Sequence, residues 1–346
     1  MINDPAMLTG IILNGAHGIY DVHTDDGILR CTLRGKLKKA FAQAQSTKPL
    51  GKSRQIHSDK LLHMTPSQRT ERIEHQNTTP PPTRLSVGDY VKIRRIDATN
   101  GLIEEILPRQ SALIRKDAGS TPKKIVQQTM LANLDQVVLV FACGQPDPHF
   151  GMLDRYLTIC ESAELHSLIC LNKADMVHPP YVEEAARLYS RLNYTVIWTS
   201  AQTGEGIAEL ALLLKDHTSF FTGPSGVGKS SLVNAIEPGM AIRTGLISDV
   251  TGKGRHTTTG SQLYPLSSGG WLADSAGIRA LTGWNILPEE LAACFVEFRP
   301  YLGECEYSDC VHIDEEGCAI QQAVQDGAID ERRYKSYVRI YNGEER

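Results

Sequence analysis

The feature that most limits the possible folds is the segment 223–230, which has the pattern G-x-x-x-x-G-K-S. It follows an apolar stretch at 218–222 and precedes a stretch of helical character, which is the context that a phosphate-binding loop requires. In such a loop, successive backbone N–H groups face phosphate oxygens at the amino terminus of a helix. The segment therefore predicts a P-loop nucleotide site, in which Lys229 neutralises phosphate charge and the Ser230 hydroxyl binds Mg²⁺.

A second motif, Asn172-Lys173-Ala174-Asp175, indicates which base such a site would take. It follows the apolar stretch 167–171, which is a predicted buried strand. The Asp175 carboxylate can accept hydrogen bonds from two guanine N–H groups at once, whereas adenine has no matching donors. We expect Asn172 and the stem of Lys173 to brace the base. Ser200 and Ala201 end the next predicted strand, where a backbone N–H can meet guanine O6. Together, these loops predict guanine specificity.

Two segments that follow the P-loop in the chain are candidates for binding Mg²⁺ and the γ-phosphate. Asp274 follows a predicted strand, so that its carboxylate could hold Mg²⁺ through water while the N–H of Gly277 reaches the γ-phosphate. A threonine within 254–259 could close over the same ion. We favour Thr258 by its register, and Thr257 stays an alternative.

A cluster of cysteines near the carboxyl end suggests a metal site. Cys305, Cys310, His312 and Cys318 supply three thiolates and one imidazole, which is a tetrahedral Zn²⁺ set. Four protein ligands leave no open position, so the predicted role is structural. The surrounding segment has too few apolar residues to fold without a bound metal ion. The other cysteines are scattered, which fits a reducing compartment better than a disulfide scaffold.

The order of apolar segments predicts three domains. Short strands within 8–39, 87–97 and 101–116 predict a five-stranded closed β-barrel at 1–127, interrupted by a polar insertion at 40–84 that we interpret as a mobile loop. Alternating strands and helices at 128–283 predict an α/β domain with a parallel sheet covered on both faces. A mainly helical zinc-binding domain is expected at 284–346.

Charge is unevenly distributed over the chain. Residues 1–130 contain 20 Lys and Arg against 12 Asp and Glu, a net charge of +8 within a protein whose total is −4. A basic amino-terminal part suggests a polyanionic partner there, although an ordinary solvated surface accounts for the charge equally well. The apolar runs are shorter than the roughly 20 residues that cross a bilayer, and the first residues lack a basic secretory start. We therefore expect no membrane partner.

The guanine motifs precede the P-loop in this chain, whereas ordinary GTPases begin with it. This order, the preceding barrel and the trailing Cys/His cluster resemble the ribosome small subunit-dependent GTPase A family of circularly permuted GTPases. The resemblance implies an amino-terminal OB-fold, a permuted GTPase domain and a zinc domain. It also implies a cytoplasmic GTPase that binds the 30S ribosomal subunit and 16S rRNA in late subunit maturation, with hydrolysis stimulated by that particle. Nothing in the sequence suggests self-association, so we expect a monomer.

The resemblance also assigns residue roles. Ile278 occupies the place where many GTPases have a water-orienting glutamine, so another group must act, and the resemblance points to His256. Ala276 stands where the family more often has proline. The predicted catalytic residues are His256, Thr258 and Lys229, and the predicted magnesium ligands are Ser230 and Thr258. The predicted nucleotide-binding residues are Asn172, Lys173, Asp175, Ser200, Ala201, Gly223, Pro224, Ser225, Gly226, Val227, Gly228, Lys229, Ser230, Ser231, Asp274 and Gly277.

Two other functions compete with a GTP-driven switch. A P-loop phosphotransferase acting on a small molecule would share the phosphate loop, but it has no need of the guanine motifs. An RNA-binding module could use the nucleotide only to stabilise its fold. A preference for ATP would favour the first alternative.

Overall fold

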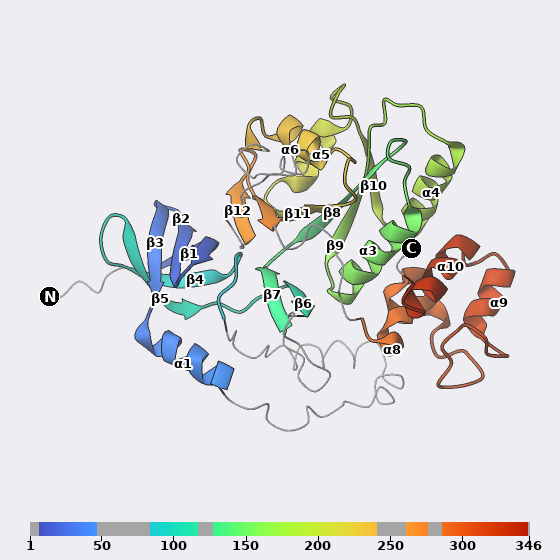
Figure 1. Ribbon diagram of the computed structural model, residues 1–346, viewed down its shortest axis with the longest axis horizontal. Coiled ribbons are helices and arrows are strands. Elements are labelled where there is room, and N and C mark those ends of the chain that lie inside the picture. The colour runs from blue at the N-terminus through green and yellow to red at the C-terminus, as the bar shows by residue number, and fades with distance from the viewer. Residues whose placement is uncertain (1–6, 47–83, 117–126, 241–260, 276–285, 345–346) are drawn as a thin grey trace. The chain divides into compact units, whose positions relative to one another are not determined.

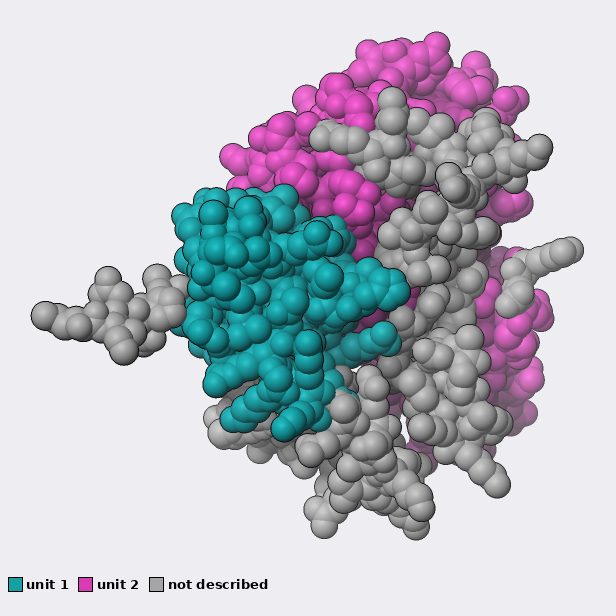
Figure 2. All heavy atoms as spheres, turned by 60° about the vertical axis from the view of Figure 1, so that its left-hand side comes forward, with its two compact units in different colours: residues 1–110 teal, residues 111–346 magenta. Residues whose placement is uncertain are grey.

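The computed structural model describes residues 7–46, 84–116, 127–240, 261–275 and 286–344. The chain divides into two compact units, residues 1–110 and 111–346 (Figure 2). The three-domain boundaries expected from the sequence stay a prediction. Among the helices of the described ranges, none has both the length and the apolar character that crossing a bilayer requires.

The first unit is a closed five-stranded barrel, as predicted (Figure 1). Its strands run in the order β1-β2-β3-β5-β4, and β1 pairs with β4 to close it, in the manner of an OB-fold. Alternate residues point inward, so that Val22, Leu29, Ile93 and Ile103 are buried. The strands are Met7–Ala16 (β1), Ile19–Thr24 (β2), Gly27–Leu33 (β3), Tyr90–Arg95 (β4) and Asn100–Ile106 (β5).

Two expectations for this region need correction. The predicted single strand at 101–116 is divided, because β5 ends at Ile106 and Ala112–Lys116 (β6) pairs instead with Gln127–Ala132 (β7). Pro108 stands between the two parts and has no N–H to continue a ladder. The insertion is expected to be a loop from residue 40, but Gly35–Ser46 forms a helix (α1). The remainder of the insertion lies outside the described residues.

The second unit contains a six-stranded sheet in the order β10-β9-β8-β11-β13-β12. All neighbouring pairs are parallel except β12 with β13, so the expected parallel sheet has one antiparallel edge. Its strands are Gln136–Ala142 (β8), His166–Asn172 (β9), Thr195–Thr199 (β10), Thr218–Thr222 (β11), Ser261–Pro265 (β12) and Trp271–Ser275 (β13). The helices beside it are Phe150–Ser162 (α3), Pro180–Arg191 (α4), Ile207–Leu214 (α5) and Lys229–Ile236 (α6).

Helices cover both faces of this sheet, as the sequence predicts (Figure 1). Every residue of β8 is buried, which is expected of a strand covered on both sides. Val138 and Val140 share a core with residues of α5 and α6. On the opposite face, the Phe141 ring lies 6.1 Å from the ring of Tyr156 on α3.

The carboxyl-terminal part is a small helical region with a core of its own. Phe295 and Phe298 stack at its centre and Tyr337 meets both rings edge to face, with ring centroids 5.0 to 5.5 Å apart. The segment that starts at Pro288 is a short helix followed by two 3₁₀ helices, and Pro300 lies inside the second of these. The elements are Pro288–Leu291 (α8), Ala292–Cys294 (η3), Val296–Tyr301 (η4), Ala319–Gln325 (α9) and Glu331–Tyr341 (α10).

Candidate nucleotide and metal sites

The predicted phosphate loop connects the end of β11 to the start of α6. Gly228 caps α6 with a φ of 94°, a left-handed conformation that favours glycine. A Cβ at this position would lie 2.4 Å from Nδ2 of Asn172, and a Cβ at Gly223 would lie 2.0 Å from the carbonyl oxygen of Val140. Neither glycine can therefore be replaced without displacing a neighbour. The start of a helix that follows such a loop favours an anion.

The side chain of Lys229 folds back over this loop. Its ammonium group donates to the carbonyl oxygens of Gly223 at 2.9 Å and of Pro224 at 2.7 Å. The positive charge is thus held beside the curled backbone that the sequence assigns to phosphate. This is the position from which a lysine can neutralise a phosphate oxygen.

The predicted base-binding loop is bonded directly to the phosphate loop. Asn172 is buried at the end of β9, and its Nδ2 donates to the carbonyl oxygen of Val227 at 2.8 Å. The Thr199 hydroxyl donates to Oδ1 of the same amide at 3.2 Å. Lys173 donates to the carbonyl oxygen of Gly226 at 2.7 Å. Segments more than 50 residues apart in sequence are therefore fixed to each other, because neighbouring parallel strands end at one edge of the sheet.

A pocket of about 370 Å³ opens where these loops meet, a size typical of small-molecule sites. Inside it, the Ser200 hydroxyl donates to Oδ1 of Asp175 at 2.5 Å. Ser200 in turn accepts from the backbone N–H groups of Gln202 and Thr203, which orients its proton toward the carboxylate. The pocket is lined by Asn172, Lys173, Asp175, Met176, Ser200, Ala201, Gln202, Gly228 and Ser231.

Burial keeps a neighbouring thiol neutral. It raises the pKa of Cys143 to about 12, and the nearby charges of Asp175 and Glu205 act in the same direction. Cys143 is therefore protonated near neutral pH and adds no negative charge beside the Asp175 carboxylate.

Asp274 lies on a strand beside the one that leads into the phosphate loop. In the parallel pair β11 and β13, Phe220 is opposite Ala273, so Asp274 stands level with Phe221, two residues before Gly223. On its other side Asp274 pairs with Gln262 of β12. Burial raises the pKa of the neighbouring Tyr264, and the charge of Asp274 raises it further. The strand thus brings a carboxylate to the edge of the sheet where the phosphate loop begins.

Several predicted residues lie outside the described part of the chain. These are the candidate catalytic and magnesium residues His256, Thr257 and Thr258 and, after β13, Ala276, Gly277 and Ile278. Their roles stay predictions.

The four predicted zinc ligands come together in the carboxyl-terminal region. Their ligand atoms all lie within 4.8 Å of one another. Nδ1 of His312 is 3.5, 3.4 and 3.5 Å from the sulfurs of Cys305, Cys310 and Cys318, and the sulfurs of Cys305 and Cys318 are 4.0 Å apart. A tetrahedral Zn²⁺ with usual bond lengths requires about 3.6 Å between nitrogen and sulfur and about 3.8 Å between sulfurs. The donor set therefore fits a structural zinc ion.

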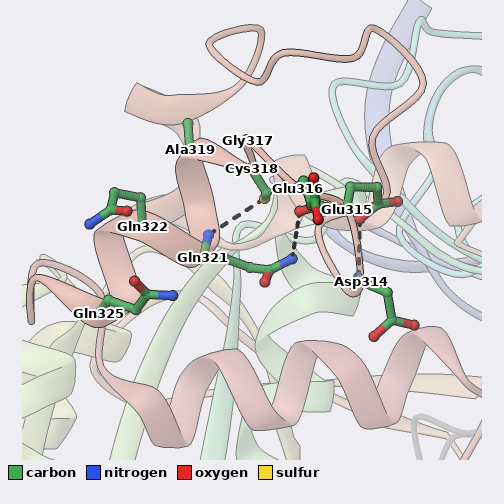
Figure 3. Close-up of a pocket in the computed structure, with 9 residues that line it drawn as sticks. All are labelled: Asp314, Glu315, Glu316, Gly317, Cys318, Ala319, Gln321, Gln322 and Gln325. Carbon is green, nitrogen blue, oxygen red and sulfur yellow. Dashed lines mark hydrogen bonds between the residues drawn. The ribbon is translucent and has the colours of Figure 1, made fainter.

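Outer contacts hold this ligand loop in shape. Tyr334 and Tyr337 on α10 donate hydroxyl protons to the carbonyl oxygens of His312 and Val311 at 2.9 and 2.7 Å. The Glu315 carboxylate accepts from three backbone N–H groups of the same loop. Gln321 adds two contacts, one from its backbone N–H to the sulfur of Cys318 and one from its side chain to the carbonyl oxygen of Glu315 (Figure 3). Hydrogen bonds of this kind, made around the ligands and not to the metal, orient the side chains that bind a metal ion.

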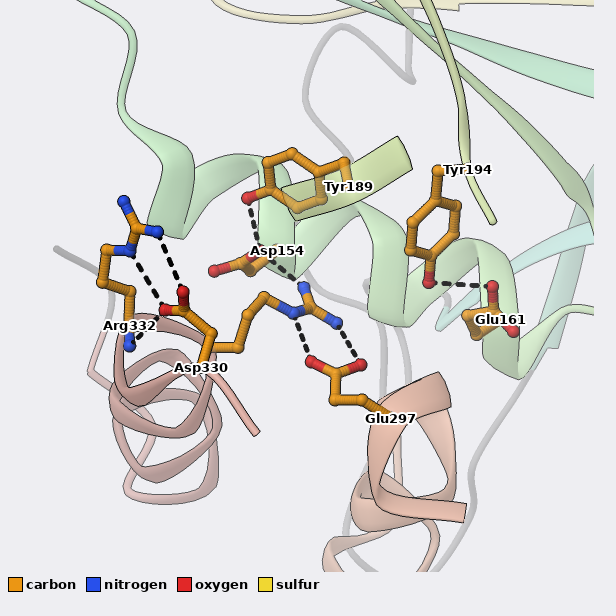
Figure 4. Close-up of polar contacts among 8 residues, drawn as sticks. Asp154, Glu161, Tyr189, Tyr194, Glu297, Asp330 and Arg332 are labelled. Carbon is orange, nitrogen blue, oxygen red and sulfur yellow. Dashed lines mark hydrogen bonds and ion pairs between the residues drawn. The ribbon is translucent and has the colours of Figure 1, made fainter. Parts of the chain in front are cut away.

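One buried polar cluster was not predicted from the sequence. Arg333 on α10 is 1% exposed and binds the carboxylates of Asp154 on α3 and Glu297 on η4. Figure 4 labels these two carboxylates and Tyr189, whose hydroxyl also bonds Asp154. Burial alone would lower the pKa of Arg333, but the two carboxylates raise it well above its usual range, so the charge is retained. This cluster joins the helical carboxyl-terminal region to the helix that follows β8.

The sheet, the phosphate loop and the base motifs that precede it in the chain define the class of protein. It is a P-loop domain whose motif order is circularly permuted, flanked by a barrel and a Cys₃His region.

Comparison with known proteins identifies the family. A model of the RsgA GTPase matches residues 106–284, and the chain belongs to that family of GTP-hydrolysing enzymes. The chain is 38% identical over 339 residues to the small ribosomal subunit biogenesis GTPase RsgA of Gemmatimonas aurantiaca, and this match covers 96% of each protein. It is 34% identical over 333 residues to the protein of that name from Caldanaerobacter subterraneus subsp. tengcongensis, covering 96% of this chain and 94% of the other.

Two solved structures resemble the whole chain. YjeQ from Thermotoga maritima gives a TM-score of 0.70 at 30% identity, covering 98% of this chain and 99% of its own. YloQ, described as a circularly permuted GTPase, gives 0.67 at 26% identity, covering 99% and 97%. The resemblance to a permuted GTPase family with barrel and zinc regions is thus confirmed.

Proposed function

We propose that this protein is a GTP hydrolase that binds the 30S ribosomal subunit and its 16S rRNA and acts as a GTP/GDP switch in late maturation of that subunit. The observation that carries the proposal is the pocket in which Asp175 and Ser200 lie beside a phosphate loop bonded to Asn172 and Lys173. Support for the ribosomal partner comes from relatives named for small-subunit biogenesis along nearly their whole length. A cytoplasmic, monomeric protein with the domains 1–127, 128–283 and 284–346 completes the proposal.

In this proposal, the base and the phosphates are held by different parts of one edge of the sheet. The Asp175 carboxylate accepts from guanine N1–H and the exocyclic amine, and Ser200 holds that carboxylate in place. The backbone N–H groups of 223–230 and the Lys229 ammonium bind the phosphates. Ser230 and Thr258 bind Mg²⁺, with Asp274 acting on the ion through water and the N–H of Gly277 reaching the γ-phosphate.

The barrel unit is proposed to contact rRNA. Exposed basic side chains on it include Arg30 on β3 and Lys36, Lys38 and Lys39 on α1. Phosphate contacts of this kind weaken with added salt, because binding releases condensed counterions. Few aromatic residues, chiefly Tyr20 and Tyr90, lie among the basic residues of the barrel, so we propose recognition through backbone and shape rather than base stacking.

The GTPase rate with and without 30S subunits tests the function. We expect slow turnover by the protein alone, because a hydrophobic Ile278 cannot orient the attacking water, and at least about tenfold faster turnover with the subunit. The measurement is phosphate release at saturating GTP, with 50S subunits as the control particle. A fast rate that 30S subunits leave unchanged would refute the switch.

His256 is proposed to act on the attacking water, through its side chain or its backbone. Replacing His256 with alanine should reduce 30S-stimulated turnover by about 100-fold or more, because positioned general acid–base groups contribute on this order. The affinity for GTP should stay unchanged. Stimulated turnover at the wild-type rate in this variant would remove the side chain from the mechanism.

A further inference from the structure

Arg333 occupies an unusual position for a charged side chain. It belongs to α10 in the zinc-binding region, yet its guanidinium is buried and contacts two carboxylates from other elements. One nitrogen lies 2.5 Å from Oδ1 of Asp154 on α3, and two others lie 2.6 and 3.1 Å from the carboxylate oxygens of Glu297. Its central carbon also lies 4.6 Å from the ring centre of Phe295. The guanidinium therefore bonds two carboxylates at once while it lies against an aromatic ring.

Asp154 brings a second helix into the same contact. The Tyr189 hydroxyl on α4 donates to Oδ1 of Asp154 at 2.7 Å, so α3 and α4 meet at the carboxylate that binds Arg333. Phe150, the first residue of α3, packs its ring against Tyr181 and Tyr189 of α4 at 6.2 and 6.1 Å. The two helices are thus held together beside the buried ion pair between Arg333 and Asp154.

These two helices follow two loops that meet at Lys173, a residue that lines the base pocket. The loop before α3 contains Gln145, whose carbonyl oxygen accepts a hydrogen bond from Lys173. The loop before α4 contains Lys173 itself and Asp175, which lines the pocket. Lys173 also binds the phosphate loop at Gly226. A shift of α3 against α4 would therefore change the distance between Gln145 and Lys173 and disturb both loops.

We propose that Arg333 is a positioning residue for the nucleotide pocket, through which the zinc-binding region fixes the two loops that meet at Lys173. The proposal rests on the proposed nucleotide roles of Lys173 and Asp175. By linkage, an event that moves α10 changes nucleotide affinity, and nucleotide binding in turn stabilises the position of α10. The carboxyl-terminal region is then part of the nucleotide-binding machinery as well as a stable fold.

Two variants of the full-length protein test this role. Arg333→Lys keeps the charge but cannot bind two carboxylates with a planar fork, and Tyr189→Phe removes only the hydroxyl that joins α4 to Asp154. The probe is GDP carrying a fluorescent methylanthraniloyl group. We expect the Kd to rise about tenfold for Arg333→Lys, a usual coupling magnitude, and by about two- to tenfold for Tyr189→Phe. Amide hydrogen exchange within 143–149 should become faster in both.

The control is Lys335→Ala, which removes a basic side chain from the same helix, where its ion partner is Glu331 one turn away. It should leave the Kd and the exchange unchanged.

Bound zinc and the melting temperature are measured for every variant. If Arg333 only stabilised the fold, its replacement would lower the melting temperature without changing the Kd of the folded protein. Wild-type Kd values in both folded, zinc-containing variants would overturn the proposal. If Arg333→Lys does not fold, Tyr189→Phe decides alone. Absence of binding by the wild-type protein would instead refute the proposed nucleotide site.

Discussion

Replacing Asp175 with asparagine is expected to weaken GTP binding by at least about 100-fold, which is the largest effect expected from one substitution in the pocket. Two hydrogen bonds to a charged acceptor contribute about 1.5–3 kcal/mol each, and an amide facing guanine leaves a donor opposite a donor. Because xanthine carries a carbonyl in place of the exocyclic amine, the amide can pair with it. The preference should therefore shift toward xanthosine triphosphate. Calorimetric titration with both nucleotides measures the change.

A matched control for this substitution is Glu209→Gln, which neutralises an exposed carboxylate on α5. It should bind GTP as the wild-type protein does. An Asp175→Asn variant that keeps the wild-type affinity and the wild-type preference would show that this carboxylate does not recognise the base. A wild-type protein that prefers ATP would favour a phosphotransferase instead.

Removing the zinc is expected to unfold the carboxyl-terminal region. Apparent binding free energies for structural Zn²⁺ are about 10–16 kcal/mol, which is at least as large as the whole stability of most domains. The core of this region includes Cys318, Phe295 and Phe298 and is small, so it cannot replace such a contribution. Cys310→Ser should lose the metal and the tertiary fold of this region. Zinc analysis and amide exchange of α9 and α10 are the measurements.

Cys294→Ser is the control for the zinc prediction. Cys294 is a buried cysteine of the same region, and its thiol donates to the carbonyl oxygen of Glu290. This variant should retain one equivalent of zinc and the protected amides. Wild-type protein purified without stoichiometric zinc, or a Cys310→Ser variant with unchanged exchange, would contradict a structural metal.

The sequence predicts the parts of the site whose chemistry is local. The phosphate loop is evident because its glycines, lysine and flanking strand and helix are adjacent in the chain. The zinc set is evident because three cysteines and a histidine in such close spacing are typical of a structural zinc site. In both cases the structure brings the predicted residues together. The base pocket requires one further step, since Asp175 and Ser200 meet only because β9 and β10 are parallel neighbours.

What the sequence does not reveal depends on contacts between distant segments. From the sequence, the apolar run that forms β6 is predicted to be a barrel strand. An apolar run shows that a strand is buried but does not show which strand it pairs with. The structure shows that β6 pairs with β7 and not with a strand of the barrel. The role of Arg333 is hidden in the sequence because its partners Asp154 and Glu297 lie 179 and 36 residues away. One signal is present. Arg333 shares a helical face with the buried Ser336 and Tyr337, and a charged residue on a buried face requires a partner.

The central claim is that the base and the phosphates of GTP are bound by segments that converge on one edge of the sheet. A crystal structure with Mg²⁺ and a non-hydrolysable GTP analogue tests this claim most directly. We predict the guanine edge within hydrogen-bond distance of Asp175 and the phosphates against the backbone of 223–230. A nucleotide bound with its base away from Asp175 and Ser200 would contradict it.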